Sequence, residues 1–214
     1  MTAKQDHEIA LVEALLIDLG LQATALQPGD RPDVLAAIGG SWVGIEVTEL
    51  HPDAGAAGSQ VRADEQRAAR SHEVRWHWGG TDYAGAIGCQ LAEKVAKAQG
   101  YTVPNGGALW LLISSQIPRE GQLAATFALG EWVRLADLAA LEPVLVSSPY
   151  DALFVHLICD RRVLEWRRGS GFREHDRLDP AEKQSRRDGA KAVWDVIGEL
   201  KNRPLPVRIV GSFG

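Results

Sequence analysis

The sequence predicts an α/β (α+β) fold in which a mixed central sheet is flanked by helices. Apolar residues recur with helical spacing over residues 6–19 and 84–99. Two extended runs, 33–38 and 41–50, surround Gly39-Gly40, which is typical of a β-hairpin. The short apolar run 108–114 is bounded by turn residues, which favours a fully buried strand.

The remaining elements are expected around these anchors. Gly20 marks the end of the first helix, and the next residues predict a short strand over 21–26 and a turn over 27–30. We expect the rest of the chain to form, in order, a loop over 51–60, a polar helix over 59–74, a helix over 122–140, strands near 152–158 and 162–166, an Arg-rich loop, a helix over 180–201 and a last strand over 207–211.

Length and composition place this chain among ordinary globular domains. With 214 residues, 45% of them apolar and 24% charged, it is neither disordered nor a coiled-coil rod. We expect one domain over 1–214, with a core over 6–114 that residues 115–214 extend. No run is apolar enough to span a membrane, and the acidic N-terminus is unlike a secretory signal, so we expect a cytoplasmic protein. Cys89 and Cys159 are expected to be small buried side chains.

The charge is unevenly distributed. The net charge of −5 and a pI near 5.7 exclude a protein that coats nucleic acid electrostatically. Acidic residues nevertheless dominate residues 1–60, whereas basic residues dominate 161–191. This asymmetry fits a metal site beside a phosphate-binding surface, and it fits a solvated surface equally well.

The predicted hairpin brings two carboxylates together. If Gly39-Gly40 form its loop, Asp33 lies directly opposite Glu46, with Cβ atoms about 4.5–5.5 Å apart. Carboxylates this close raise each other's pKa unless a cation lies between them, and Mg²⁺ or Mn²⁺ is the natural cation for oxygen ligands. The alternative is a pair of solvated carboxylates on an exposed face, and a shift of one residue in register would separate them.

Pro32-Asp33, followed after residues 34–45 by Glu46-Val47-Thr48 on this hairpin, resembles the PD-(D/E)XK nuclease superfamily. The resemblance covers residues 6–114 and implies a restriction-endonuclease-like core. It implies that Asp33 and Glu46 bind Mg²⁺, with the Val47 carbonyl as a third ligand. The chain departs from the family at Thr48, where a Lys usually positions the attacking water. Some members take this Lys from a neighbouring helix instead.

Two helices offer residues that complete such a site. Glu8 falls on the inward face of the first helix and matches the first-helix Glu that often lies near the metal in this superfamily; alternatively, it is a first-turn Glu favoured by the helix dipole. Lys94 falls on the apolar stripe of the helix over 84–99, flanked by Gln90 and Lys97. It either extends to water or pairs with the carboxylates in place of the missing strand Lys.

Further residues are candidates for contact with nucleic acid. Arg62, Gln66 and Arg67 lie on the predicted polar helix, where phosphate contact and simple solvation explain them equally. We expect Lys97 to take part in substrate binding and the basic segment 161–191 to hold the backbone. Trp76 and Trp78 could stack on bases if exposed.

Three hypotheses follow. The first is a Mg²⁺-dependent nuclease with Glu8, Asp33, Glu46 and Lys94 at its active site, with Mn²⁺ as a substitute ion and a homodimer as a possible assembly. The second is a nuclease-like fold without catalysis that serves as a binding or assembly protein, which Thr48 and the net acidity favour. The third is an unrelated α/β binding protein in which the hairpin motif is a coincidence.

Overall fold

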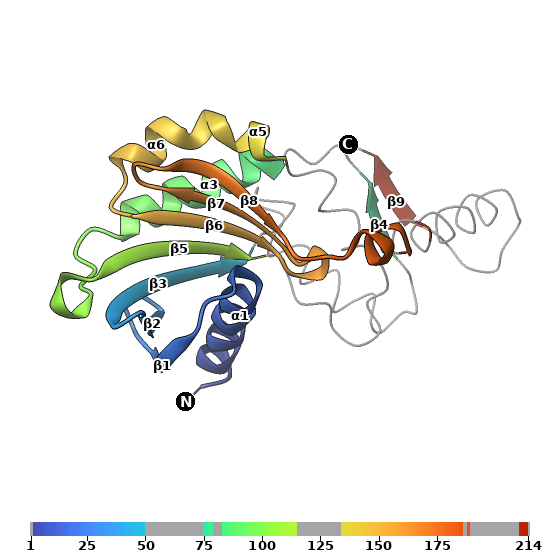
Figure 1. The fold of residues 1–214 in the computed structure, drawn as a ribbon. Helices are drawn as coiled ribbons and strands as arrows, with labels where there is room; N and C mark the ends of the chain where they lie inside the picture. The colour runs from blue at the N-terminus through green and yellow to red at the C-terminus, as the bar shows by residue number, and fades with distance from the viewer. Residues whose placement is uncertain are drawn as a thin grey trace, which may run out of the picture.

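The structure, a computed structural model, describes residues 2–49, 75–78, 83–114, 134–185, 188 and 210–213. It is a mixed α/β structure with a seven-stranded sheet in the order β1-β2-β3-β5-β6-β7-β8 (Figure 1). The strands of this sheet are β1 (Ala23–Pro28), β2 (Val34–Ile38), β3 (Ser41–Glu49), β5 (Ala108–Ser114), β6 (Ala152–Leu157), β7 (Arg162–Arg167) and β8 (Gly171–Asp176). Strands β3, β5 and β6 are mutually parallel, and the outer strands on both sides pair antiparallel.

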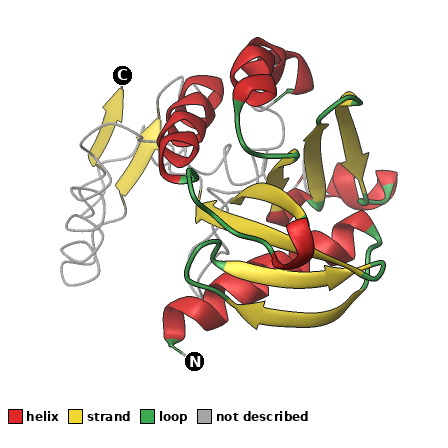
Figure 2. Cartoon of the chain, turned by 90° about the vertical axis from the view of Figure 1, so that its left-hand side faces the viewer, coloured by secondary structure: helices red, strands yellow, loops and turns green. Residues whose placement is uncertain are grey.

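Helices cover both faces of the sheet (Figure 2). They are α1 (Ala3–Leu19), α3 (Tyr83–Lys97), α5 (Leu135–Leu138) and α6 (Glu142–Ser147), with short 3-10 turns η1 (Pro104–Gly106), η2 (Ala139–Leu141) and η3 (Ile158–Asp160). Helix α1 packs on one face, and α3, α5 and α6 lie on the other (Figure 1). No helix in the described ranges is long and apolar enough to cross a bilayer.

Each face of the sheet has its own apolar layer. On the α1 face, Leu11 and Leu15 pack with Ile45 of β3. Side chains of β5 also belong to this layer. On the opposite face, Ile87 and Leu91 of α3 pack with the side chains that β5 directs to that face. Strand β5 is therefore buried on both sides, which confirms the prediction for residues 108–114.

The elements predicted within residues 2–49 and 83–114 are confirmed, with shifted ends. Helix α1 begins at Ala3 rather than residue 6, because Thr2 and Gln5 form a capping box before the first apolar residue of the stripe. Strand β1 runs to Pro28, two residues into the expected turn. The helix expected over 84–99 is α3.

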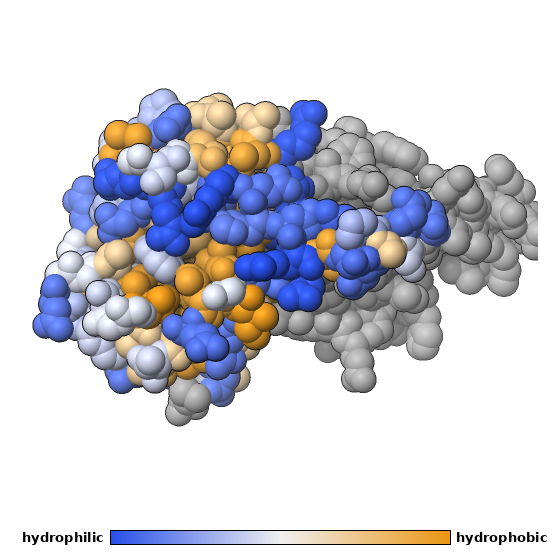
Figure 3. All heavy atoms as spheres, in the orientation of Figure 1, coloured by the Kyte–Doolittle hydropathy of each residue, from blue (hydrophilic) through white to orange (hydrophobic). Residues whose placement is uncertain are grey.

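The region after β7 differs from the prediction. Residues expected to form an Arg-rich loop form strand β8, which pairs antiparallel with β7 at the edge of the sheet. Its charged side chains lie over this edge, and Figure 3 shows a hydrophilic band there. Such charges protect an exposed edge strand from pairing with another chain. The sequence did not predict β8 because this strand lacks alternating apolar residues. Most of its side chains are instead charged or polar and form ion pairs with neighbouring residues.

Some predictions fall wholly or partly outside the described residues. They are the loop over 51–60, the helix over 59–74, residues 122–133 of one predicted helix, residues 186–187 and 189–201 of another, and residues 207–209 of the last strand. The described end of the helix expected over 122–140 continues through η2 and α6 to Ser147. Strand β4 (Arg75–Trp78) was not predicted, and it pairs parallel with β9 (Val210–Phe213). The prediction that Cys89 is buried is wrong, since it lies on the solvent side of α3.

Candidate functional site

The hairpin has the register that the sequence predicts. Val34 pairs with Ile45 and Ile38 with Ser41, around a loop in which Gly39 and Gly40 both adopt positive φ. Asp33, which directly precedes Val34, consequently lies across from Glu46. Two-residue loops of this kind fix the register because their twist matches that of the strands.

Asp33 is anchored by the backbone of the facing strand. Its Oδ2 accepts a hydrogen bond of 2.9 Å from the Val47 amide. The preceding turn is closed by a bond of 2.7 Å from the Gly29 amide to the Asp33 carbonyl. These two backbone hydrogen bonds hold the Asp33 carboxylate beside Glu46.

Glu46 is buried and receives the amine of Lys94. Lys94 Nζ lies 2.7 Å from Glu46 Oε1 and 3.2 Å from the Val47 carbonyl oxygen. The hydroxyl of Tyr101 also hydrogen-bonds to Glu46. Lys94 of α3 thus supplies an ammonium group at the motif where the chain has Thr48.

The position of Lys94 follows from the packing of α3. Ile87, Leu91 and Ala98 are buried against the sheet, and Lys94 shares their side of the helix. The Tyr150 hydroxyl donates to the Lys94 carbonyl at 3.2 Å, which ties this end of the helix to the segment before β6. Of the two alternatives left open for Lys94, the structure shows pairing, and the partner is Glu46.

The flanking polar residues of α3 have other contacts. Gln90 Nε2 donates to the Glu49 carbonyl at 2.6 Å, at the end of β3. Lys97 is exposed and pairs with Glu93 one turn earlier in the helix. It therefore makes no contact with Asp33 or Glu46 in this structure.

Helix α1 contributes Glu8 and, unexpectedly, Lys4. Glu8 is buried on the inward face, as predicted. Lys4 Nζ lies 2.9 Å from Glu8 Oε1 and 3.6 Å from Asp33 Oδ1, so its ammonium bridges the two carboxylates. The Lys4–Glu8 spacing of four residues is a sequence signal for such a pair, but nothing in it indicates Asp33.

Burial is the main cause of the raised pKa values at this site, and neighbouring carboxylates add to it. Burial raises the pKa of Glu46; the hydrogen bond from Lys94 offsets part of this effect, and the charge of Asp33 adds to it. Burial likewise raises the pKa of Glu8, with Lys4 opposing and Asp33 reinforcing. Burial and then the charge of Glu46 raise the pKa of Tyr101 to about 12. Three carboxylates share two ammonium groups, an arrangement that a further cation would stabilise.

The donor set suits a hard divalent ion. Asp33, Glu46 and the Val47 carbonyl supply oxygen atoms, and Mg²⁺ commonly binds through one or two carboxylates while keeping several waters. Within the described ranges, no group of three or more His, Cys, Asp or Glu side chains is arranged to hold a metal. Any such ion would therefore depend on these two carboxylates, the carbonyl and water. Glu8 is linked to this group because Lys4 contacts both Glu8 and Asp33.

Most of the basic segment is already paired. Arg161 binds Asp18 at 3.0 Å, Arg162 binds Glu174 at 2.7 Å, and Arg177 donates to the Asp18 carbonyl. These contacts leave fewer free cations for phosphate than the charge count of residues 161–191 suggests. Arg62, Gln66 and Arg67 lie outside the described residues, as do the side chains of Trp76 and Trp78.

No protein family, curated protein or solved structure matches the chain significantly.

Proposed function

We propose that the chain is a Mg²⁺-dependent phosphodiester hydrolase that acts on nucleic acid. The observation that carries the proposal is the contact of Lys94 Nζ with both Glu46 Oε1 and the Val47 carbonyl, across from Asp33. It brings two carboxylates, a backbone carbonyl and an ammonium group together beside β3. These are the group types that metal-assisted phosphodiester hydrolysis uses.

Each residue has a defined task in this proposal. Asp33 and Glu46 hold the ion, which supplies a Lewis acid and lowers the pKa of a bound water. The Lys94 ammonium orients the attacking water and balances charge that develops on the phosphate. Tyr101 keeps its proton at neutral pH, since its pKa is about 12, and so acts as a hydrogen-bond donor that orients Glu46.

The second candidate is a binding protein with the same architecture and no catalysis. Lys4 and Lys94 favour it, because their ammonium groups already occupy positions beside the carboxylates that a metal would take. In that case nucleic acid binds without being cut, and added Mg²⁺ leaves the affinity unchanged.

Hydrolysis of labelled DNA and RNA in Mg²⁺ or Mn²⁺, with wild type and Lys94→Gln, tests the proposal. We expect Lys94→Gln to lower kcat about 100-fold, the size of effect seen when one preorganised donor is removed. Arg134→Gln, which removes an exposed charge at the start of α5, is the matched control and keeps wild-type kcat. Wild type that binds nucleic acid but never cuts it supports the second candidate, and wild type that does neither contradicts both.

A further inference from the structure

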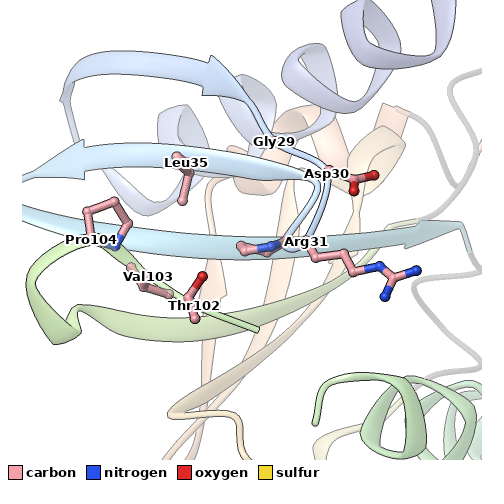
Figure 4. A pocket seen from close by; sticks show the side chains of 8 residues that line it. Gly29, Asp30, Arg31, Leu35, Thr102, Val103 and Pro104 are labelled. Carbon is pink, nitrogen blue, oxygen red and sulfur yellow. The ribbon is translucent and has the colours of Figure 1, made fainter. Parts of the chain in front are cut away.

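An open hollow of ≈ 450 Å³ is lined in part by Pro32 and Thr102, which directly precede Asp33 and follow Tyr101 in the chain. It lies between the loop that carries Arg31 and the segment that carries Thr102 and Pro104 (Figure 4). Pro32, Leu35 and Val103 give it apolar walls. Cavities of about 300–1,000 Å³ accommodate small-molecule units the size of a nucleotide.

Arg31 is one of the residues that line this hollow, and no described residue pairs with its charge. Its side chain is exposed, and it forms no ion pair or hydrogen bond with any described residue. Figure 4 shows its guanidinium extending outward from the loop, on the same side as the Asp30 side chain and away from Val103 and Pro104. The two site lysines differ from Arg31, since both contact carboxylates. Arg31 is thus available to bind an anion that approaches the site.

The loop fixes Arg31 relative to the carboxylates. A Cβ at Gly29 would lie 2.1 Å from the Pro32 carbonyl oxygen, so only glycine fits where the loop folds back. The same fold-back positions Asp33 two residues later. On the other wall, the positive charge of Arg31 acts on Tyr101, which hydrogen-bonds to Glu46. Chain neighbours of Asp33 and Tyr101 therefore line the hollow, Pro32 on one wall and Thr102 on the other.

We propose that the hollow binds the nucleotide next to the scissile phosphate, with Arg31 holding its phosphate. Guanidinium groups bind phosphate through two parallel hydrogen bonds, which fixes the position of the group as well as attracting it. Before a divalent ion binds, three carboxylates and two lysines leave the neighbouring site negative, and the Arg31 charge offsets this repulsion for an approaching phosphate. The sugar and base then lie against Pro32 and Pro104. This subsite rests on the proposed function for its substrate class, a strand of DNA or RNA.

Fluorescence anisotropy tests the subsite with Ca²⁺ in place of Mg²⁺. The probes are fluorescein-labelled single-stranded DNA, single-stranded RNA and duplex DNA of about 12 nucleotides, the size of an ordinary single-strand binding site. We expect Arg31→Gln to weaken binding about tenfold and to lower the salt dependence of log K by about one phosphate contact. Arg31→Lys should fall between this variant and wild type, and Asp30→Asn should tighten binding. Arg134→Gln is the charge-matched control and keeps wild-type affinity.

The outcomes separate the subsite from the proposed hydrolysis. If Arg31→Gln binds every probe as wild type does, the subsite is wrong and the proposed function stands. If Arg31→Gln weakens binding while wild type cuts nothing in Mg²⁺, the subsite stands and hydrolysis is wrong. If folded wild type binds none of the probes, both fail. The probe that wild type binds most tightly distinguishes DNA from RNA.

Discussion

Two clusters of buried charge in this molecule are built in opposite ways. In the sheet extension, Glu165 of β7 is fully buried and contacts three basic side chains, those of Arg167, Arg173 and His175. Burial raises the pKa of Glu165, but the hydrogen bonds from these partners outweigh burial and lower the pKa to about 2. One carboxylate is here satisfied by an excess of donors.

The candidate site has the reverse balance. Its carboxylates outnumber its ammonium groups, and the pKa values of Glu8 and Glu46 are raised. Such repulsion lowers stability unless a ligand removes it, and groups arranged in this way are typical of functional sites. The Glu165 carboxylate therefore has more cationic partners than it needs, whereas the Asp33–Glu46 cluster has fewer, which is why we propose binding at the second cluster and not at the first.

Substitution should affect the two clusters in opposite directions. We expect Glu165→Gln to lower the free energy of unfolding by about 3 kcal/mol, because it removes the shared partner of several cations. Asp33→Asn should change it by less than about 0.5 kcal/mol or raise it, since the amide oxygen keeps the bond from the Val47 amide while the repulsion is lost. Urea unfolding at neutral pH with unchanged m-values measures both. If both variants lost the same free energy of unfolding, the two clusters would not differ in their effect on stability, and this prediction would be wrong.

The free energy of unfolding should depend on pH through both Glu165 and Glu46, with opposite signs. Glu165 has a folded pKa of about 2 against 4.5 for the free group, so its contribution is complete above pH 4.5 and is lost as pH falls toward 2. Glu46 has a raised folded pKa, so its folded form binds more protons and stability declines as pH rises above 4.5 through that pKa.

The pH dependence of stability is measured by urea unfolding of wild type, Glu165→Gln and Glu46→Gln at pH values from the acid range to neutrality. Glu165→Gln should flatten the acid side of the curve, by about 3 kcal/mol in total. Glu46→Gln should flatten the decline above pH 4.5 and leave the acid side intact. Curves in which the two substitutions act on the same limb would contradict the assignment.

The smallest expected effect concerns Lys4. Its ammonium is mostly exposed and competes with any metal for Glu8 and Asp33. Lys4→Gln should therefore tighten Mn²⁺ binding only about two- to fivefold, as for other exposed ion pairs. Calorimetry or paramagnetic relaxation measures the affinity, with Arg134→Gln as the control. Weaker binding by Lys4→Gln would show that Lys4 supports the site rather than competing for it.

Local chemistry determined which parts of the site were predictable from sequence. Gly39-Gly40 specify a hairpin register, and that register alone places Asp33 across from Glu46. Helical periodicity places Lys94 on the packed side of α3. In both cases the regular geometry of the backbone, a strand pairing or a helix, determines which residues lie close together, so their spacing in the sequence is enough to predict the contact.

The missed residues do not follow from such regular geometry. Tyr101 follows the end of α3, and its contact with Glu46 depends on how the helix packs on the sheet. Lys4 reaches Asp33 only because α1 crosses the start of β2. Strand β8 was mistaken for a loop because ion pairs such as Arg162–Glu174 replace apolar alternation, although Gly169 and Gly171 between two extended runs are a hairpin signal.

The most direct measurement is a Mn²⁺ titration of wild type, Asp33→Asn and Glu46→Gln, followed by calorimetry. Glu174→Gln, which removes a carboxylate paired with Arg162 far along the sheet, is the control. If the carboxylates form a metal site, wild type and the control bind one ion in the micromolar to millimolar range, and both site variants lose at least about tenfold in affinity. Folded wild type that binds no Mn²⁺ at millimolar concentration, or site variants that bind it as well as wild type does, would contradict the metal site.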